Sequence, residues 1–142
     1  GVLGAMLLNG ATRAEEAAIH QRAIDLLHYV QIEERADDLA KNLSYGDQRR
    51  LEIARALATD PKLLCLDEPA AGMNGTETAE LRALIDGIRR DGTTILLIEH
   101  DVKLVMGLCD RVAVLDYGAL VIEDVPAVVQ KDQRVIEAYL GA

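Results

Sequence analysis

Two adjacent carboxylates, Asp67 and Glu68, are the residues best placed to do chemistry, because they end the apolar stretch 63–66. A short apolar run is typical of a strand buried on both faces of a parallel sheet, and Pro69 ends it because proline has no N–H for the ladder. Ligands of open α/β sheets bind at such strand ends. Successive side chains point to opposite faces, so one carboxylate can serve a metal ion and the other a water molecule. The stretch alone is equally compatible with a strand end followed by two solvated acids.

A second candidate site is the beginning of an amphipathic helix. Ser44 is a suitable N-cap, and Asp47 stands three residues later, as in a capping box. Helix N-termini bind phosphate, and Gly46 would let the backbone approach one closely. Taken alone, the segment favours a plain capping box. A third candidate is His100, which follows an apolar strand; alone, it is better explained as a polar residue flanking a helix.

The elements that position these residues alternate along the chain. Helices are predicted over residues 14–30, 49–58, 76–90 and 134–140, with another helix capped by Asp101. The arginines of the second helix are expected to face outward. Strands are predicted over residues 63–66, 93–98, 111–116 and 119–122, with a hairpin turn at Tyr117 and Gly118. Alternation of strand and helix indicates an α/β fold with a parallel sheet.

Composition narrows the classes of function. A length of 142 residues predicts one domain, and a net charge of −9 argues against a nucleic-acid partner, since such proteins show a basic face. No apolar run approaches the roughly 18 residues of a membrane span, and the N-terminus lacks the layout of a signal peptide. Cys65 and Cys109 are isolated in apolar settings, so we expect buried, reduced thiols in a cytosolic protein.

In combination, these segments resemble the ATP-binding subunits of ABC transporters. Residues 44–48 (S-Y-G-D-Q) match the signature motif of that family, residues 63–68 its Walker B strand and residues 70–74 its D-loop, while His100 matches its switch histidine. The spacings between these motifs match as well. The resemblance implies a P-loop NTPase (RecA-like) fold. Residues 1–59 would belong to the helical subdomain and residues 60–142 to the C-terminal part of the catalytic core.

Within that family, the chain is most similar to the ATPase subunits of branched-chain amino acid importers. The phrases that carry this similarity are A-A-G-M-N, L-L-I-E-H-D, V-L-D-Y-G and V-I-E-A-Y-L-G. Tyr45 replaces the first glycine of the general signature. Met73 and Asn74 stand where many members have Leu and Asp, which weakens any role that requires an acid at residue 74.

The resemblance implies roles for the two carboxylates and the histidine. Asp67 would hold Mg²⁺ through water, and Glu68 would polarise the water that attacks the γ-phosphate of ATP. His100 would hydrogen-bond that phosphate. Phosphoryl transfer depends mainly on positioning and charge neutralisation, which these groups supply in part.

The resemblance also implies contacts across a dimer of ATPase subunits. The signature residues would reach the nucleotide held by the opposite subunit: Ser44, Tyr45, Gly46 and Gln48. Gly72 and Asn74 of the D-loop would also bind nucleotide. The expected partners are a second ATPase subunit, an integral membrane permease and, indirectly, a solute-binding protein. The expected location is the cytoplasmic face of the inner membrane, as a peripheral protein.

The phosphate-binding half of such a site is missing from this sequence. A phosphate loop reads G-x-x-x-x-G-K-[ST], and no Gly-Lys pair occurs here. In the family this loop lies upstream, so we expect the chain to be the C-terminal part of an ABC ATPase and to be inactive alone. The strand that carries the loop would lie between the strand leading to His100 and the strand at residues 111–116, so the sheet should be incomplete.

Three functions remain open from the sequence. The first is ATP hydrolysis that energises branched-chain amino acid import. The second is a non-hydrolysing, truncated domain that only binds a permease or a partner ATPase. The third is an ABC ATPase of a non-transport pathway such as DNA repair or translation, although those usually carry long insertions or tandem domains, which are absent here. An upstream reading frame with a Gly-Lys-Ser/Thr loop would favour the first over the second.

Overall fold

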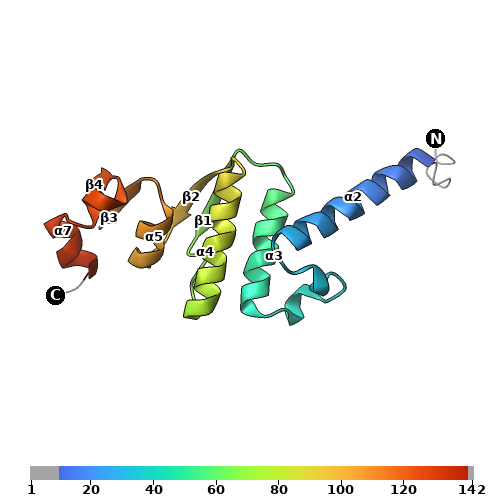
Figure 1. The fold of residues 1–142 in the computed structure, drawn as a ribbon, viewed down its shortest axis with the longest axis horizontal. Coiled ribbons are helices and arrows are strands. Elements are labelled where there is room, and N and C mark those ends of the chain that lie inside the picture. Colours follow the sequence, from blue (N-terminus) through green and yellow to red (C-terminus); the bar gives the residue numbers. More distant parts are fainter. Residues whose placement is uncertain (1–9, 141–142) are drawn as a thin grey trace. The chain divides into compact units, whose positions relative to one another are not determined.

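The computed structural model describes residues 10–140 of the chain, which divides at Lys62 and Leu63 into two compact units (Figure 1). The beginning of the predicted helical subdomain, residues 1–9, lies outside the described part. No helix among the described residues is long and apolar enough to cross a membrane.

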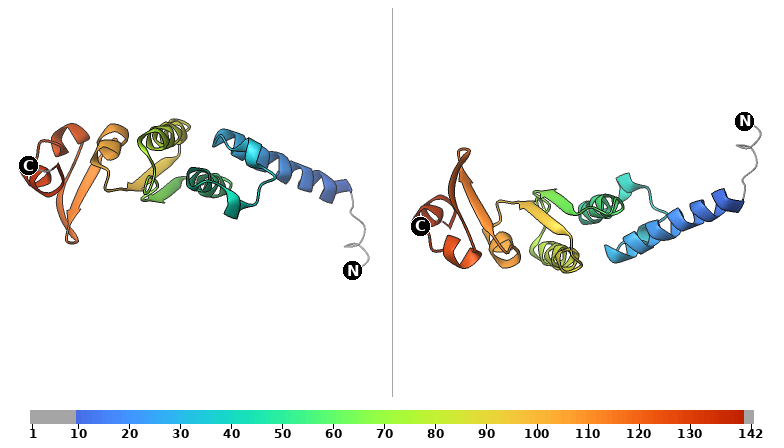
Figure 2. Two further views of the ribbon diagram at one scale, coloured as in Figure 1. Left: turned by 90° about the horizontal axis from the view of Figure 1, so that it is seen from below. Right: turned by 90° about the horizontal axis from the view of Figure 1, so that it is seen from above.

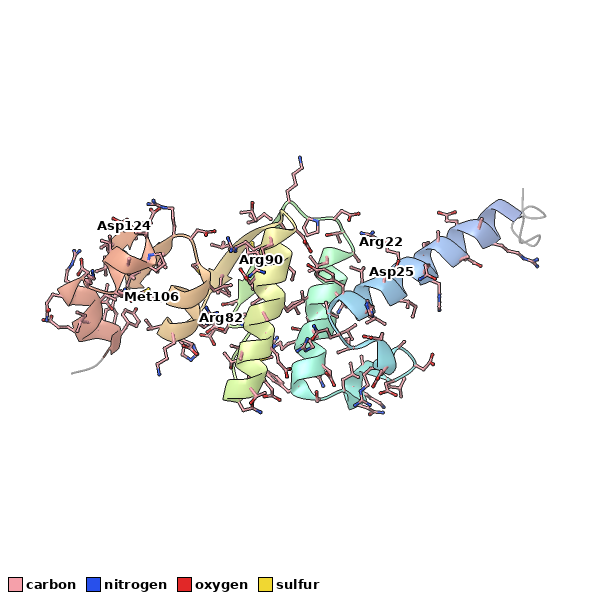
Figure 3. The ribbon with its side chains drawn as sticks, viewed as in Figure 1. Arg22, Asp25, Arg82, Arg90, Met106 and Asp124 are labelled. Atoms are coloured by element: carbon pink, nitrogen blue, oxygen red, sulfur yellow. The ribbon has the colours of Figure 1, made fainter. Side chains whose placement is uncertain are left out.

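The described residues of the first unit contain helices and the segments that connect them. Its elements are α2 (Gly10–Tyr29), the short 3₁₀ helices η1 (Glu33–Arg35) and η2 (Ala40–Asn42), and α3 (Tyr45–Leu57). The predicted helix at residues 14–30 is therefore confirmed, with an earlier start. Val30 and Ile32, just after α2, are buried. Arg22 of α2 (Figure 3) forms an exposed ion pair with Asp60, 2.5 Å apart.

One arginine of α3 corrects the sequence analysis. Arg50 was expected to face outward, but it is only 9% exposed. Its Nη1 donates a hydrogen bond to the Val30 carbonyl at 2.9 Å and lies 3.3 Å from Gln31 Oε1. A buried guanidinium is tolerated when its N–H groups have acceptors, and here the chain leaving α2 supplies them. Arg50 thus ties α3 to the end of α2.

This contact gives a stability prediction. Arg50→Met should lower the free energy of unfolding by about 1–3 kcal/mol, because the buried Val30 carbonyl loses its charged donor. Urea unfolding of the complete protein, followed by far-UV circular dichroism, measures the change. Arg55→Met is the matched control, since Arg55 is exposed on the same helix. Equal effects of the two substitutions would contradict the role of Arg50.

The second unit contains two small sheets and several helices. Its elements are β1 (Leu63–Asp67), α4 (Gly75–Arg90), β2 (Thr94–Ile98), α5 (Val102–Leu108), β3 (Val112–Asp116), β4 (Ala119–Asp124), α6 (Pro126–Val129), α7 (Gln133–Val135) and a π-helical turn η3 (Ile136–Leu140). These positions confirm the predicted strands and helices to within a few residues. β1 and β2 are parallel, with Leu63 opposite Thr94 and Asp67 opposite Ile98, as a βαβ unit requires.

Helix α4 covers one face of the β1–β2 sheet (Figure 2). Its apolar side is buried at Leu81, Leu84, Ile85 and Ile88. Only Leu64 of β1 is buried, whereas Leu63 and Cys65 are exposed. The prediction of a strand buried on both faces is therefore wrong, because the described residues of this unit cover only one side. The expectation of a buried thiol also fails at Cys65.

The second sheet is the predicted hairpin. β3 and β4 are antiparallel, and the turn residues Tyr117 and Gly118 have φ angles of 45° and 79°. Two successive positive φ angles define a type I′ turn, which matches the twist of paired strands, and glycine supplies the second at no steric cost. Val112, Val129 and Val135 form a small buried core. Met106 (Figure 3) and the half-buried Cys109 pack against it, and burial raises the pKa of the Cys109 thiol.

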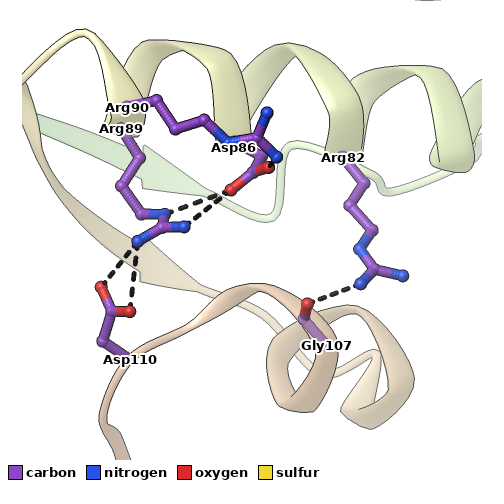
Figure 4. Close-up of polar contacts among 6 residues, drawn as sticks. All are labelled: Arg82, Asp86, Arg89, Arg90, Gly107 and Asp110. Carbon is purple, nitrogen blue, oxygen red and sulfur yellow. Dashed lines mark hydrogen bonds and ion pairs between the residues drawn. The ribbon is translucent and has the colours of Figure 1, made fainter.

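Polar contacts join α4 to α5 and to the segment that follows it (Figure 4). Arg82 Nη2 donates to the Gly107 carbonyl at 2.6 Å. Arg89 lies between two carboxylates, 2.9 Å from Asp86 and 3.2 Å from Asp110. The hydrogen bond from Arg89 is the largest influence that lowers the pKa of Asp86. The helix after His100 is therefore held to α4 by charged groups at the surface.

The sheet is incomplete at the predicted place. Among the described strands, β2 pairs only with β1, and β3 pairs only with β4. A hollow of about 940 Å³ lies between β2 and β3, with Leu96, Ile98, Val105 and Leu115 among its lining residues. The edges of β2 and β3 that face this hollow have no strand partner within residues 10–140, which confirms the expected gap.

Candidate functional site

The candidate site begins where β1 ends. Asp67 is the last residue of the strand and is exposed, and Glu68 follows it with a φ of 44°. A left-handed backbone is unfavourable for a residue with a side chain, and such strain concentrates at functional sites. The Glu68 N–H donates to the Ile98 carbonyl at 2.8 Å, which extends the β1–β2 contact by one residue before the chain turns.

Glu68 and His100 are brought together, as the order of parallel strands predicts. Glu68 Oε1 lies 3.4 Å from His100 Nδ1. Their side chains are 53% and 71% exposed, so both are accessible to a ligand and to water. A carboxylate can orient an attacking water, and an imidazole can hydrogen-bond a phosphate oxygen. Asp67, Glu68 and His100 thus share one end of the β1–β2 sheet.

A magnesium ion fits the donors at this end of the sheet. No group of three or more His, Cys, Asp or Glu side chains among residues 10–140 is placed to hold a metal ion. Mg²⁺ is usually bound by only one or two carboxylates, with water and substrate phosphates completing its octahedron. Asp67 provides one exposed carboxylate, which is enough for such a site.

The D-loop residues have clear structural roles. Gly72 has a φ of 76°, which glycine adopts without strain. The Asn74 side-chain oxygen accepts the N–H groups of Thr76 and Glu77 at 2.9 and 3.0 Å, and Glu77 completes a capping box. This cap fixes the beginning of α4 directly after the loop. Asn74 is predicted above to bind nucleotide; the cap is an additional role, which the N-x-x-E spacing also indicates.

The signature residues lie in the first unit, at the beginning of α3. Ser44 is the N-cap, and its Oγ accepts the Asp47 N–H at 3.1 Å, as predicted. Gln48 Nε2 donates to the Leu43 carbonyl at 3.0 Å. Gly46 is half-buried in the first turn of the helix.

Tyr45 is organised by an arginine one turn along α3. Arg49 Nη2 donates to the Tyr45 hydroxyl at 2.7 Å, and the guanidinium lies 5.1 Å from the centre of the ring. Arg49 also pairs with Glu52 at 2.7 Å. Hydrogen bonds to Glu52 and then to Tyr45 raise the pKa of Arg49, so the guanidinium beside the signature stays charged.

One residue of the site was missed by sequence analysis. Glu99 lies between the end of β2 and His100, and its side chain is only 1% exposed. Its carboxylate accepts the Ala70 N–H at 2.9 Å and the His100 N–H at 3.2 Å. An acid directly after an apolar strand was the only available signal, and nothing in the pattern distinguished it from a solvated charge.

Comparison with known proteins gives the family to which this sequence and fold are similar. Residues 4–71 match the ABC transporter family, and residues 123–142 match the family described as branched-chain amino acid ATP-binding cassette transporter. Solved structures with the same fold include an ATP-binding cassette, MJ1267 in its ADP conformation, at 29% identity and a TM-score of 0.79 over 88% of this chain and 51% of that one. Another is cbiO1 from Clostridium perfringens, at 31% identity and a TM-score of 0.77 over 95% of this chain and 53% of that one.

The chain belongs to the ABC transporter ATP-binding family. Curated relatives include the high-affinity branched-chain amino acid transport ATP-binding proteins LivG of Salmonella typhimurium, 46% identical over 99% of this chain, and BraF of Pseudomonas aeruginosa, 44% identical over 98%. The lipopolysaccharide export protein LptB of Escherichia coli is 35% identical over 84% of the chain and 50% of its own length. The chain spans 56% of LivG and 55% of BraF, or about half the length of the relatives it matches.

Proposed function

We propose that this chain is part of an ATPase subunit that energises import of branched-chain amino acids. The observation that carries the proposal is the Glu68–His100 pair at the end of β1 and β2, within a chain similar to LivG over nearly its whole length. Identity to the amino acid transport proteins exceeds identity to the lipopolysaccharide export protein, which supports the choice of solute.

The reaction follows from the chemistry of these side chains. Glu68 orients and polarises the water that attacks the γ-phosphate, and His100 donates a hydrogen bond to that phosphate. Asp67 would hold Mg²⁺ through water, and the ion would supply neutralisation of the phosphate charge. Phosphoryl transfer requires mainly this positioning and charge compensation. The 3.4 Å separation of Glu68 and His100 supports a shared role of the two groups at one phosphate and its attacking water.

The remaining predicted residues act between subunits in this proposal. Residues 1–59 form the helical subdomain, which docks on a membrane permease, and residues 60–142 belong to the catalytic core. The signature residues Ser44, Tyr45, Gly46 and Gln48 contact the nucleotide of a second ATPase subunit, with help from Gly72 and Asn74. The assembly lies at the cytoplasmic face of the inner membrane, and a solute-binding protein delivers the amino acid.

The proposed function predicts a difference between this chain and the complete protein. The 142-residue chain should not bind Mg-ATP with micromolar affinity, because it lacks the Gly-Lys phosphate loop. The complete protein with its permease should couple ATP hydrolysis to leucine uptake in proteoliposomes. Calorimetric titration and radiolabelled uptake measure the two quantities. Micromolar binding by the short chain would refute the first expectation, and hydrolysis-coupled transport of another solute without leucine would refute the second.

A further inference from the structure

Glu99 is a buried carboxylate for which the proposed reaction assigns no role. Its side chain is 1% exposed, although Oε2 lies 3.9 Å from Nδ1 of the exposed His100, which in turn lies 3.4 Å from Oε1 of the exposed Glu68. Burying a carboxylate costs free energy unless hydrogen-bond donors compensate it. The position therefore needs a physical explanation.

The two donors to Glu99 come from two different loops. Oε1 accepts the Ala70 N–H at 2.9 Å, and Oε2 accepts the His100 N–H at 3.2 Å. Ala70 belongs to the loop that follows Glu68, and His100 belongs to the loop that follows β2. One carboxylate thus bridges the two segments that carry the paired site residues. Hydrogen bonds from N–H groups to a charged oxygen are stronger than neutral ones, so this bridge is a firm constraint.

The helices that follow these two loops are held by other groups. The N-terminus of α5 is capped by Asp101, whose Oδ1 accepts the Leu104 N–H at 3.1 Å. The far end of α5 is held by Arg82. The N-terminus of α4 has its own capping box at Asn74. Glu99 therefore serves none of these helix ends, and its contacts concern only the relation between the two loops.

We infer that Glu99 is a positioning residue for ATP hydrolysis, which sets the separation of Glu68 and His100 by binding the Ala70 and His100 amides with one carboxylate. The inference rests on the proposed function. Small displacements of catalytic groups, on the order of 1 Å, can cost about 100-fold in rate. Glu99 is thus expected to affect turnover and leave nucleotide affinity unchanged.

Glu99→Gln in the complete protein is the informative substitution. Glutamine has the same length, but its amide oxygen can accept only one of the two N–H groups well, and its NH₂ group faces the other. We expect kcat to fall by roughly 10–100-fold, with the KM for ATP changed less than about threefold. Glu99→Asp is the second variant, because it keeps the charge but is one methylene too short to reach both loops; it should show the same pattern.

A double-mutant cycle separates positioning from general destabilisation. If Glu99 acts through His100, Glu99→Gln should reduce kcat less than about threefold in a His100→Ala background, because the effects are not additive. Arg82→Met is the control, since it removes one polar contact between α4 and α5 without touching either loop. Glu123→Gln is the charge-matched control, as Glu123 is an exposed partner of Arg111. Both controls should leave kcat close to the wild-type value.

Amide hydrogen exchange gives a readout that does not depend on activity. The N–H groups of Ala70 and His100 should exchange faster in Glu99→Gln than in wild type and in Glu123→Gln. A wild-type kcat in both Glu99 variants, equal losses with and without His100, or unchanged exchange at both amides would overturn the inference. If the wild-type protein hydrolyses no ATP, the proposed function fails and the role in hydrolysis fails with it, while exchange still reports whether the bridge exists.

Discussion

Glu68→Gln in the complete protein should leave ATP binding intact and slow hydrolysis by roughly 10²–10⁴, the range for loss of a positioned general base. The substitution keeps the size and hydrogen-bonding reach of the side chain but removes the charge that orients the water. Glu68 is suited to this role because it is half-exposed at the end of β1 and lies 3.4 Å from His100. Binding of a fluorescent ATP analogue and phosphate release under saturating Mg-ATP measure the two quantities.

The charge-matched control for this experiment is Glu123→Gln. Glu123 is another half-exposed carboxylate of the same unit, paired with Arg111 at 3.2 Å. The Glu123→Gln variant should hydrolyse ATP at the wild-type rate. If hydrolysis in Glu68→Gln fell only a few-fold, Glu68 would be a bystander, and His100 would be the better candidate for the principal role.

Local signals in the sequence predicted much of the fold. Ser44 and Asp101 cap α3 and α5 as expected, because a cap residue and the backbone N–H group that donates to it are close in sequence. The Tyr117–Gly118 turn follows from its own backbone requirements. The proximity of Glu68 and His100 follows from parallel pairing, which brings the carboxyl ends of consecutive strands to one edge.

Features that depend on distant partners could not be predicted in this way. Arg50 is a charged residue of an amphipathic helix, so a surface position is expected. Its burial is tolerated because the Val30 carbonyl, twenty residues earlier, accepts its hydrogen bond. Glu99 directly follows an apolar strand, where a solvated acid is expected. Its carboxylate is nevertheless buried, and it accepts a hydrogen bond from the Ala70 N–H on another loop. In both cases a charged side chain is compensated by a backbone group that no local periodicity indicates.

The exposure of one face of β1 also depends on residues that are distant in the sequence. An apolar run indicates that a strand is covered, but it does not say by which part of the protein. α4 covers one face of the β1–β2 sheet (Figure 2), and Leu64 is buried, whereas Leu63 and Cys65 are exposed within the described residues. The run of apolar residues therefore predicted the strand correctly and its burial incorrectly.

Ser44→Arg should abolish ATP-driven dimerisation and turnover while sparing ATP binding by the monomer. Ser44 caps α3, and a helix N-terminus stabilises an anion only within about its first turn. A phosphate must therefore lie against Ser44 for the residue to matter. In the proposed arrangement that phosphate is held by the second subunit, so a bulky arginine blocks the dimer and not the monomer's own site. Size-exclusion chromatography with ATP, in a hydrolysis-deficient background, measures dimerisation.

Loss of the cap itself must be separated from loss of the phosphate contact. Removing a serine N-cap costs about 0.5–2 kcal/mol of stability, since the Asp47 N–H loses its acceptor. Ser44→Asp is the control, because aspartate is an equally good N-cap but repels a phosphate. It should retain the wild-type unfolding midpoint and still fail to dimerise with ATP. If the Ser44→Asp variant dimerised with ATP, loss of the helix cap alone would explain the effect of Ser44→Arg.

Mixed dimers test whether Ser44 acts in trans. Pairing the Ser44→Arg subunit with a subunit defective only in its phosphate loop should place both defects in one composite site and leave the other site intact. If the two sites hydrolyse ATP independently, turnover should then persist at the intact site. The cis alternative makes the opposite prediction for the isolated subunit: if the Ser44 variant lost ATP affinity as a monomer, the residue would contact its own nucleotide, and the signature would not be an intersubunit contact.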